Sequence, residues 1–490
     1  MKTNVKKNAL LNMLRQVCAI VFPFLTFSYA SRVLGADKIG MYTFGQSVTS
    51  CFACLASLGI GDYAVREGAA VHDDPKKLGQ LANEMFTLQL WSTFLSYALL
   101  LLLLKLWGRS APYRYVLLIQ SMQMALSVIG ADWINTACGD FLYLSVRYLL
   151  TASVCTAALF CFVRGPEDLY AYTFFSMLCT SGGNLWNVFY IRRYVKLRPV
   201  LRLRLKKHLP PVLMLFGNSI ALAVYLNADL AILGLMLDDT AVGIYAAAAK
   251  IYLMVKAVVN AWIMAAVPQL SYLAAADRKE SCSRLLSELA DILLMLLVPA
   301  AVGIFFEAEN LIAFVAGSGY ESGAAVLRIL SIAILPAVGS CLVSYAVLVP
   351  FHLEKYFLMS TVVAAGLNTG LNIWLIPRMG IPAAALTTLL AEVFVFLSAS
   401  YHAGVADGVR ICVDRKDFRT DLAAGAAVAA VCLLVRQAGL ADIPELAVSV
   451  ACAAAACGAV LLAGKSRTFL GLVQSVWKSR RSGCQRKERR

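Results

Sequence analysis

Charged residues are scarce in this chain of 490 residues. Only 15% of the residues are Asp, Glu, Lys or Arg, whereas 60% are apolar, and the mean hydropathy is +0.72. A soluble domain carries roughly 25% charged and 45–50% apolar residues. A chain this apolar needs an apolar solvent around it, which excludes the ordinary soluble classes of protein.

Charge is absent altogether from eight long segments. Each reaches or nearly reaches the roughly 20 residues that cross a ~30 Å hydrocarbon layer as a helix. Barrel strands would instead alternate apolar and polar residues over about ten positions. The pattern predicts an all-α, polytopic membrane protein, and its uncharged segments are residues 39–61, 85–104, 169–191, 209–228, 257–276, 329–353, 356–377 and 446–464.

Long loops are missing as well. The longest are about twenty residues, too short to fold a catalytic domain, and the chain has no Walker-type Gly-rich loop for ATP. We therefore expect no enzymatic activity, no cofactor and no metal site. Division at the polar corners predicts fourteen spans: 12–34, 41–61, 82–106, 114–136, 143–163, 169–191, 213–235, 242–263, 285–306, 323–350, 357–376, 381–402, 421–437 and 445–464.

The loops between these spans differ sharply in Lys and Arg. With the N-terminus inside, the cytoplasmic segments hold 31 of these residues and the outer loops only five. Cytoplasmic loops carry the excess of basic residues in membrane proteins, so both termini are predicted to be cytoplasmic. The net charge of +15 then reflects membrane topology. The basic stretch 192–207 could suggest a nucleic-acid arm, but we interpret it as an anchor facing anionic membrane lipid, with no nucleic acid as partner.

One short corner of the sequence occurs twice, 203 positions apart. In "LGADKIGMYTFGQS" and "LDDTAVGIYAAAAK", residues 34–47 and 237–250, Gly40 aligns with Gly243 and Tyr42 with Tyr245. Six predicted helices separate the corners, and an even number preserves orientation, so the repeat is parallel, with its axis along the membrane normal. The predicted parts are a six-helix lobe 1–195, a basic linker 196–212, a six-helix lobe 213–405, two further helices 406–464 and a basic tail 465–490.

Five basic residues lie inside predicted spans, where a charge at mid-bilayer costs about 2.5–3.5 kcal/mol. Lys250 and Lys256 are the deepest, about eight and fourteen residues into their span. Arg15 and Arg147 lie near cytoplasmic ends and could extend to the interface, and Arg328 could do so at the outer side.

Only three acids accompany these bases. Asp132 lies near the inner end of its span. Asp229 lies at a depth similar to that of Lys250, so either a structural ion pair or a role in transport fits it. Glu392 could be a proton or ion site, although we favour a buried neutral acid that caps a neighbouring helix. Five bases against three acids indicate a cavity for an anion.

Four further stretches, in order along the chain, are "FPFLTFSYASRVLGADKIGMYTF…LGIGDYAVRE", "ADWINTACGDFLYLSVR", "NADLAILGLMLDDTAVGIYAAAAK" and "GLNTGLNIWLIPRMGIPAAALTTLLAE". Together they resemble the bacterial oligosaccharide-repeat-unit flippases (the Wzx type), whose superfamily also contains multidrug exporters and the lipid II flippase. Residues 366–392 are the most specific, although Pro382-Ala383 stands where the family often has Gly-Ala. The resemblance covers essentially the whole chain.

The resemblance implies a flippase in the bacterial cytoplasmic membrane. Its substrate would be an undecaprenyl-pyrophosphate-linked oligosaccharide, moved to the outer leaflet by alternating access for surface polysaccharide assembly, such as O-antigen. A polysaccharide polymerase is a further implied partner. Lys250, Arg15, Arg147, Lys256 and Arg328 would bind the pyrophosphate, with Arg32 at the outer exit. Asn218 and Asn372 could meet sugar hydroxyls, although interhelical hydrogen bonds also explain such residues.

Two other transport functions and one enzymatic function remain as alternatives. A multidrug or organic-cation exporter of the same fold would need buried acids without compensating bases, which the charge count disfavours. A lipid II-type flippase would share the fold and the cationic cavity. A membrane glycosyltransferase or polymerase would need large outer loops or clustered acids, and the outer loops here are short.

Overall fold

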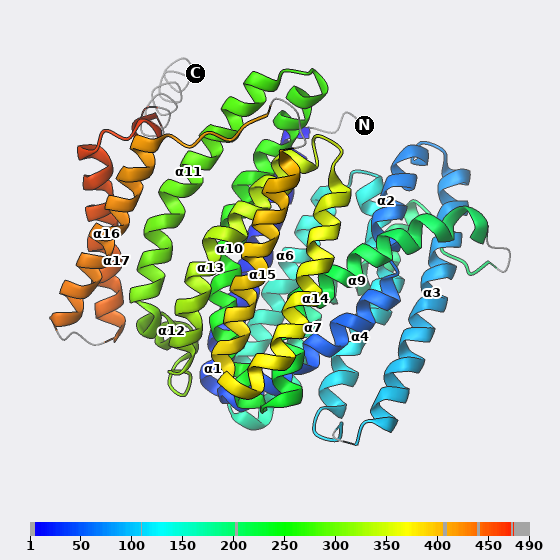
Figure 1. Cartoon of the computed structure of the whole chain (residues 1–490). Helices are drawn as coiled ribbons and strands as arrows, with labels where there is room; N and C mark the ends of the chain where they lie inside the picture. Colours follow the sequence, from blue (N-terminus) through cyan, green and yellow to red (C-terminus); the bar gives the residue numbers. More distant parts are fainter. Residues whose placement is uncertain are drawn as a thin grey trace, which may run out of the picture. The chain divides into compact units, whose positions relative to one another are not determined.

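The structure, a computed structural model, describes residues 5–108, 110–200, 204–404, 409–438, 442–471 and 474. No strand occurs among these residues, which form almost entirely helices (Figure 1). The chain divides into two compact units, Met1–Ala246 and Ala247–Arg490. The all-α fold predicted from composition is confirmed, whereas the predicted limits of lobes, linker and tail stay a prediction.

Unit 1 contains nine helices and the beginning of a tenth among its described residues. Several are longer than the predicted spans, because polar residues at the membrane interface continue the helix. The helices are α1 (Val5–Ser57), α2 (Ile60–Val71), α3 (Pro75–Leu106), α4 (Arg114–Gly130), α5 (Asp132–Ala137), α6 (Phe141–Phe162), α7 (Leu169–Ser181), α8 (Gly183–Tyr190), α9 (Leu205–Met236) and α10 (Asp239–Ala275), which continues into unit 2.

Unit 2 contains the rest of α10 and seven further α-helices among its described residues. A short π-helical turn, Ser344–Leu348, continues the third of them. The helices are α11 (Lys279–Phe306), α12 (Ala308–Ala316), α13 (Gly323–Val343), α14 (Glu354–Met379), α15 (Ile381–Ala403), α16 (Arg415–Gln437) and α17 (Asp442–Ala463).

Two predicted spans are interrupted, and two others are joined into one element. In α1 the backbone leaves the helical region at Gly35, where φ is 78°, so one long element holds the first two predicted spans. The fourth span is divided at Ala131, which has a φ of 43°, into α4 and α5. The sixth is divided at Gly182 into α7 and α8. Apolar periodicity does not report such breaks, because both sides of a break are equally apolar.

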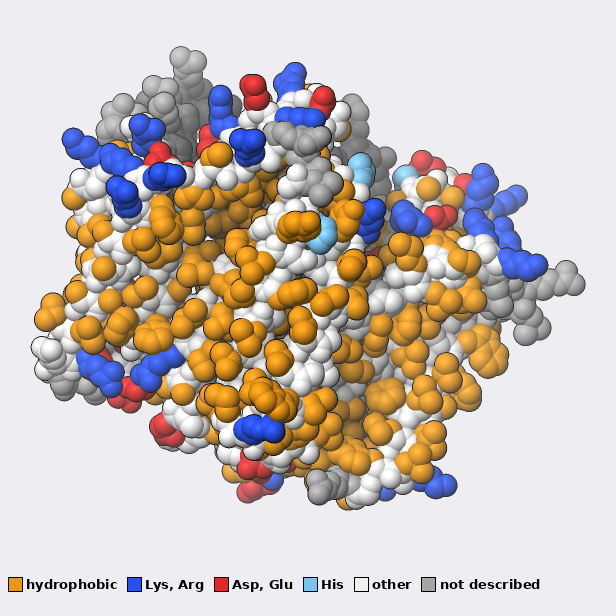
Figure 2. Space-filling model, in the orientation of Figure 1, with side chains coloured by type: hydrophobic (Ala, Val, Ile, Leu, Met, Phe, Trp, Pro, Cys, Tyr) orange, Lys and Arg blue, Asp and Glu red, His pale blue; other side chains and the backbone are white. Residues whose placement is uncertain are grey.

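Eleven of the described helical segments are long and apolar enough to cross a membrane. The first of them, Arg15–Val71, contains two predicted spans, and the pieces of the fourth and sixth spans are individually short. The expectation of about fourteen crossings agrees with this result. On each unit, hydrophobic side chains cover the middle of the helices and Lys and Arg gather at helix ends (Figure 2). Large exposed apolar side chains such as Trp91 and Phe94 would be unusual on a soluble protein.

In unit 1, an extended stretch before α9 lies along α3. The backbone N–H of Arg198 donates to Oδ1 of Asn83 at 2.8 Å, and that of Val200 donates to Oγ1 of Thr87 at 2.9 Å. Four helical residues rise about 6 Å and two extended residues span about 6.6 Å, so the two spacings match. We call these four residues the first dock. The predicted linker 196–212 is thus partly helical, because α9 begins at Leu205.

Unit 2 repeats the arrangement before α16. The backbone N–H groups of Arg410, Cys412 and Asp414 donate to side chains on α11, at distances of 3.0–3.2 Å. The acceptors are Ser283, Ser287 and Asp291, again one helical turn apart, and we call these six residues the second dock. Asn83 and Thr87 precede Ser287 and Asp291 by 204 positions, close to the 203 of the repeated corners. The sequence repeat therefore has a structural counterpart.

Candidate functional site

The two repeated corners contact each other inside unit 1. A Cβ atom added to Gly40 would lie 1.6 Å from the carbonyl oxygen of Asp239, and one added to Gly243 would lie 2.0 Å from that of Ala36. Ala36 and Asp239 are themselves equivalent positions of the repeat, so the contact is reciprocal. Glycine lets the backbones of α1 and α10 approach this closely, and Cα–H groups can then face carbonyl oxygens.

A polar centre forms in unit 1 where the interrupted helices meet. Arg147 on α6 donates two hydrogen bonds to Asp132 at the start of α5, at 2.9 and 2.7 Å. The arginine side chain is only 9% exposed and the aspartate side chain 43%. Such a two-pronged pair is among the stronger side-chain contacts, and it places a guanidinium within the apolar helices. These two predicted residues are therefore brought together.

The break between α4 and α5 leaves backbone groups that need partners. Nδ2 of Asn187 on α8 donates to the carbonyl oxygen of Gly130 at 2.5 Å and to Oδ1 of Asp132 at 3.0 Å. Asn135 in turn donates to Oδ1 of Asn187 at 2.7 Å. Non-helical backbone at membrane depth is tolerated where protein groups satisfy it. Interrupted helices with polar side chains at the break are typical of transporter binding sites.

Unit 2 holds a second buried ion pair. Nζ of Lys256 on α10 lies 2.5 Å from Oε1 of Glu392 on α15, and Tyr252 donates to the same oxygen at 2.9 Å. The glutamate side chain is 4% exposed and the lysine side chain 15%. We expected Glu392 to be a neutral acid that caps a helix; it accepts from a lysine and a tyrosine instead. Helix depth alone could not show that α10 and α15 turn these faces toward each other.

The other predicted site residues fall in different environments. Asn372 is completely buried and accepts a hydrogen bond from Thr387 at 2.6 Å, so it joins α14 to α15. Asp229 accepts from Tyr245 at 2.6 Å. Arg15 and Lys250 are partly buried and Arg32 is exposed, whereas the side chain of Asn218 lies outside those described. The expected pairing of Asp229 with Lys250 stays a prediction.

Arg328 lies near the start of α13 and pairs with α12. It donates to Glu309 at 2.8 Å, and Arg436 binds the other oxygen of the same carboxylate at 2.8 Å. The hydrogen bond from Arg328, together with Arg436, lowers the pKa of the Glu309 carboxyl. The Glu309 side chain is half exposed, so Arg328, Arg436 and Glu309 form a solvent-accessible cluster at the helix ends. Three of the five predicted cations thus have carboxylate partners: Arg147, Lys256 and Arg328.

An apolar cavity of about 1160 Å³ lies within unit 2. Side chains of α11, α13, α15 and α16 line it, among them Leu294, Leu335 and Phe396, and Arg410 of the second dock lies at its wall. Sites for small molecules usually measure 300–1,000 Å³ and combine apolar walls with a few polar groups. This cavity is larger and almost entirely apolar, so a long hydrocarbon chain suits it better than a polar metabolite.

Sequence reasoning missed several polar groups. Asn135 lies near a predicted span end, and Asn187 lies in an uncharged run. The stretch "TSGGNLWN", residues 180–187, combines two glycines with two asparagines, one of which is Asn187. Glycine-interrupted apolar segments are a known pointer to transporter sites, so this signal was present. Glu84 and His208 were also missed, because each lies close to a predicted loop and looked like an ordinary interfacial residue.

Comparison with known proteins places this geometry in context. The model of a family described as "Polysaccharide biosynthesis protein" matches residues 5–274. No curated protein sequence matches the chain. A lipid II flippase, MurJ, in an inward closed conformation is similar in structure, with a TM-score of 0.69 at 14% identity over 92% of this chain and 99% of that one.

Two exporter structures are similar as well. A multidrug resistance MATE family transporter of the MOP superfamily gives a TM-score of 0.59 at 14% identity, over 78% of this chain and 94% of that one. A MOP superfamily transporter from Pyrococcus furiosus gives 0.52 at 14% identity, over 81% and 95%. At such identities the likeness establishes the fold: that of a multi-pass membrane transporter.

Proposed function

Because this chain belongs to the family of polysaccharide biosynthesis proteins, we propose that it moves an undecaprenyl-pyrophosphate-linked oligosaccharide from the cytoplasmic to the outer leaflet of the plasma membrane. The family and the flippase-like fold support a flippase or transporter of a lipid-linked substrate. The proposed substrate is the one that the sequence resemblance implies, and its transport would serve the assembly of a surface polysaccharide.

The apolar cavity of unit 2 is the observation that carries this proposal. A polyprenyl tail is a long hydrocarbon that gains free energy wherever it leaves water, and apolar walls need no exact partner groups. The cavity exceeds the usual size of a small-molecule site. We propose that it holds part of the tail. An organic cation would instead require acids available to it, and Asp132 and Glu392 are held by Arg147 and Lys256.

A pyrophosphate headgroup needs cations inside the protein. Lys250 remains our first choice, because it lies deep in its predicted span and is partly buried. Arg147 and Lys256 already bind carboxylates, so a pyrophosphate would compete with Asp132 and Glu392 for them. Exchange of one anion for another keeps a buried cation paired throughout, which avoids the cost of an isolated charge.

Transport toward the outside agrees with the charge of the headgroup. With both termini cytoplasmic, as the Lys and Arg distribution predicts, negative charge moves outward down an inside-negative potential. This gains about 2.3 kcal/mol per charge per 100 mV. ATP would not be required for such a step.

The tail site can be tested by filling the cavity. We expect Leu335→Trp, inside it, to lower surface-polysaccharide display by tenfold or more in a cell lacking its own flippase. Leu397→Trp is the matched control, because Leu397 is 60% exposed and lies outside the cavity lining. Membrane protein levels are measured alongside. Equal display by both variants at equal levels would contradict the tail assignment.

The headgroup site can be tested by charge at one position. We expect Lys250→Gln to lose display and Lys250→Arg to retain more of it, because only the second keeps the cation. If Asp229 does no more than pair with Lys250, neutralising both residues should restore display. Full activity of Lys250→Gln would contradict the anion site and would bring organic-cation export forward.

A further inference from the structure

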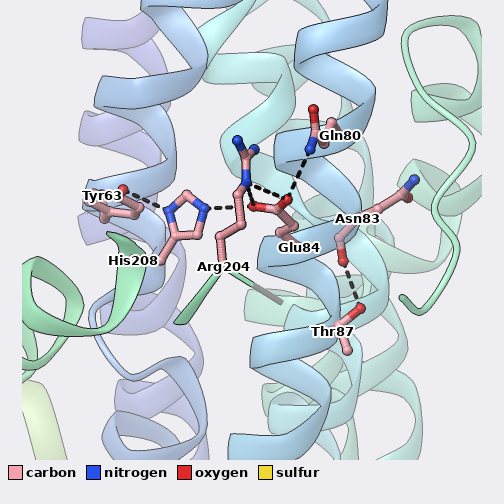
Figure 3. A network of polar contacts seen from close by, with 7 residues as sticks. All are labelled: Tyr63, Gln80, Asn83, Glu84, Thr87, Arg204 and His208. Carbon is pink, nitrogen blue, oxygen red and sulfur yellow. Dashed lines mark hydrogen bonds and ion pairs between the residues drawn. The ribbon is translucent and has the colours of Figure 1, made fainter. Parts of the chain in front are cut away.

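A buried polar network lies beside the first dock, at the start of α9 (Figure 3). Glu84 on α3 accepts from Nε of Arg204 at 3.0 Å, from Nε2 of His208 at 2.6 Å and from Gln80 at 3.3 Å. The other ring nitrogen of His208, Nδ1, lies 2.8 Å from the hydroxyl of Tyr63 on α2. Three separate parts of unit 1, namely α2, α3 and the start of α9, thus meet at one carboxylate and one imidazole.

Water is largely excluded from the centre of this network. The side chains of Glu84 and His208 are 4% and 3% exposed. Apolar residues of one core cluster, including Leu81, Met85 and Val212, surround them. Electrostatic contacts are stronger in such surroundings than in water, and an unpaired polar atom there is costly.

The charged groups that face the imidazole come from every element around it. On α3 there is Glu84, and before α9 there is Arg204, whose side chain is half exposed. On α2, Arg66 lies over the Tyr63 ring at 5.6 Å from its centroid, and Glu67 acts electrostatically on the same tyrosine. When the His208 ring is neutral, the charges of Glu84 and Arg204 balance each other. When both ring nitrogens carry a proton, these three residues together carry one positive charge.

Both protonation states of His208 can be satisfied. A neutral imidazole donates from one nitrogen and accepts at the other, and here Nε2–H would donate to Glu84 while Nδ1 accepts from Tyr63. A doubly protonated ring donates from both, and the hydroxyl of Tyr63 can turn to accept. The 2.6 Å separation from Glu84 is shorter than the usual 2.9–3.0 Å of a neutral N–H···O bond, as expected for a bond to an ionised carboxylate.

We propose that His208, Glu84 and Tyr63 form a proton-binding site that fastens the start of α9 and the preceding linker to α3 when the proton is bound. Loss of the proton leaves a hydrogen bond from a neutral imidazole to the Glu84 carboxylate in place of an ion pair. The first dock holds the same linker to α3, where Asn83 lies one residue before Glu84 and Thr87 three residues after it. The proton site and the dock therefore act on one segment. Only the further step, from this fastening to transport, rests on the proposed function.

The proton site can be read directly, because the chain contains only four histidines. The full chain, labelled with ¹⁵N- and ¹³C-histidine in lipid nanodiscs, is followed by NMR, and signals are assigned with His→Gln variants. We expect the His208 ring to show a singly and a doubly protonated state as the pH is varied, because both ring nitrogens have a hydrogen-bond partner. Glu84→Gln should shift this transition to lower pH by at least one unit. The signals of His72 and His352, which are exposed, should not move.

The fastening is measured by hydrogen exchange of the backbone at the start of α9. After correction for the intrinsic pH dependence of exchange, protection of residues 204–212 should fall about tenfold between pH 6 and pH 8. His208→Gln should remove this dependence, whereas His352→Gln should keep it, since that side chain is 93% exposed. A His208 ring that stays neutral down to pH 5, or protection that does not change with pH, overturns the proposal.

The two proposals fail separately. A chain that does not carry a lipid-linked glycan would fail the display assay and still show the His208 titration. A chain that carries one through a network without a proton would show display and no titration.

Discussion

The two docks share one backbone arrangement and differ in charge. In each, an extended stretch lies along a helix, and its alternate N–H groups meet side-chain oxygens one helical turn apart. Beside the first dock, the buried acid Glu84 is held by Arg204 and His208. Beside the second, Asp417 is held by backbone N–H groups and a hydroxyl. Asp421 is 1% exposed, and its Oδ1 has no hydrogen-bond partner among the described residues.

The comparison shows that the docks require acceptor oxygens at a fixed spacing, whereas the charged groups beside them can differ. Any short side-chain oxygen can accept from an extended backbone, so Asn, Thr, Ser and Asp serve equally, and no sequence similarity survives at the docks. The charges nearby are not constrained by that register. They distinguish a dock with a neutralised buried acid beside it from a dock with uncompensated buried acids beside it.

The largest effect should follow from removal of the acid beside the first dock. Glu84→Leu leaves His208 and Arg204 without their common partner, and breaking a buried ion pair costs about 3–5 kcal/mol. The free energy of unfolding in denaturing detergent measures this loss. Glu354→Leu is the control, because that side chain is 54% exposed and should change stability by no more than about 0.5 kcal/mol. Similar losses in both variants would refute a buried role for Glu84.

A smaller effect should follow from Ala at either repeated corner. A methyl group at Gly40 or Gly243 would overlap a main-chain carbonyl oxygen, and such overpacking costs about 1–3 kcal/mol. The reciprocal contact predicts similar costs at both positions. Gly61→Ala and Gly79→Ala, where a Cβ meets nothing within 4 Å, should be neutral or stabilising in the same unfolding measurement. A clear inequality between the corners would break the equivalence of the repeats.

The docks themselves can be compared by matched loss of one acceptor. Thr87→Val and Ser287→Ala each remove a hydroxyl that binds a backbone N–H, so each should cost about 1 kcal/mol. Hydrogen exchange at Val200 and Cys412 should accelerate locally, each in the variant of its own dock. If either amide keeps its protection, that dock does not hold its linker as the distances indicate.

The smallest effect has the opposite sign. Asp421 lies one helical turn from the buried Asp417, and one of its oxygens has no partner among the described residues. Asp421→Asn replaces a buried carboxyl group by a neutral amide, so it should raise the free energy of unfolding by about 1 kcal/mol. Glu84→Leu and Asp421→Asn would then move stability in opposite directions. A destabilised Asp421→Asn variant would show that this carboxylate has a use that its contacts do not reveal.

Much of the fold could be predicted from the sequence. Span length and hydropathy follow from the thickness of the membrane, which acts on each segment alone, so the helical class and about fourteen crossings came from composition. The alignment of Gly40 with Gly243 came from the sequence in the same way. The depth of Arg147, Asp132, Lys256 and Glu392 was also legible, since depth depends only on position along a helix.

What the tertiary structure decided is which of these groups meet. A helix with 3.6 residues per turn points its side chains in all directions around its axis, and the sequence does not state which neighbour each one meets. Only packing joined Arg147 to Asp132 and Lys256 to Glu392, placed one corner glycine against the backbone of the other repeat, and laid each linker along its helix. The network at His208 arose for the same reason, because its three parts come from different segments of the chain: α2, α3 and the start of α9.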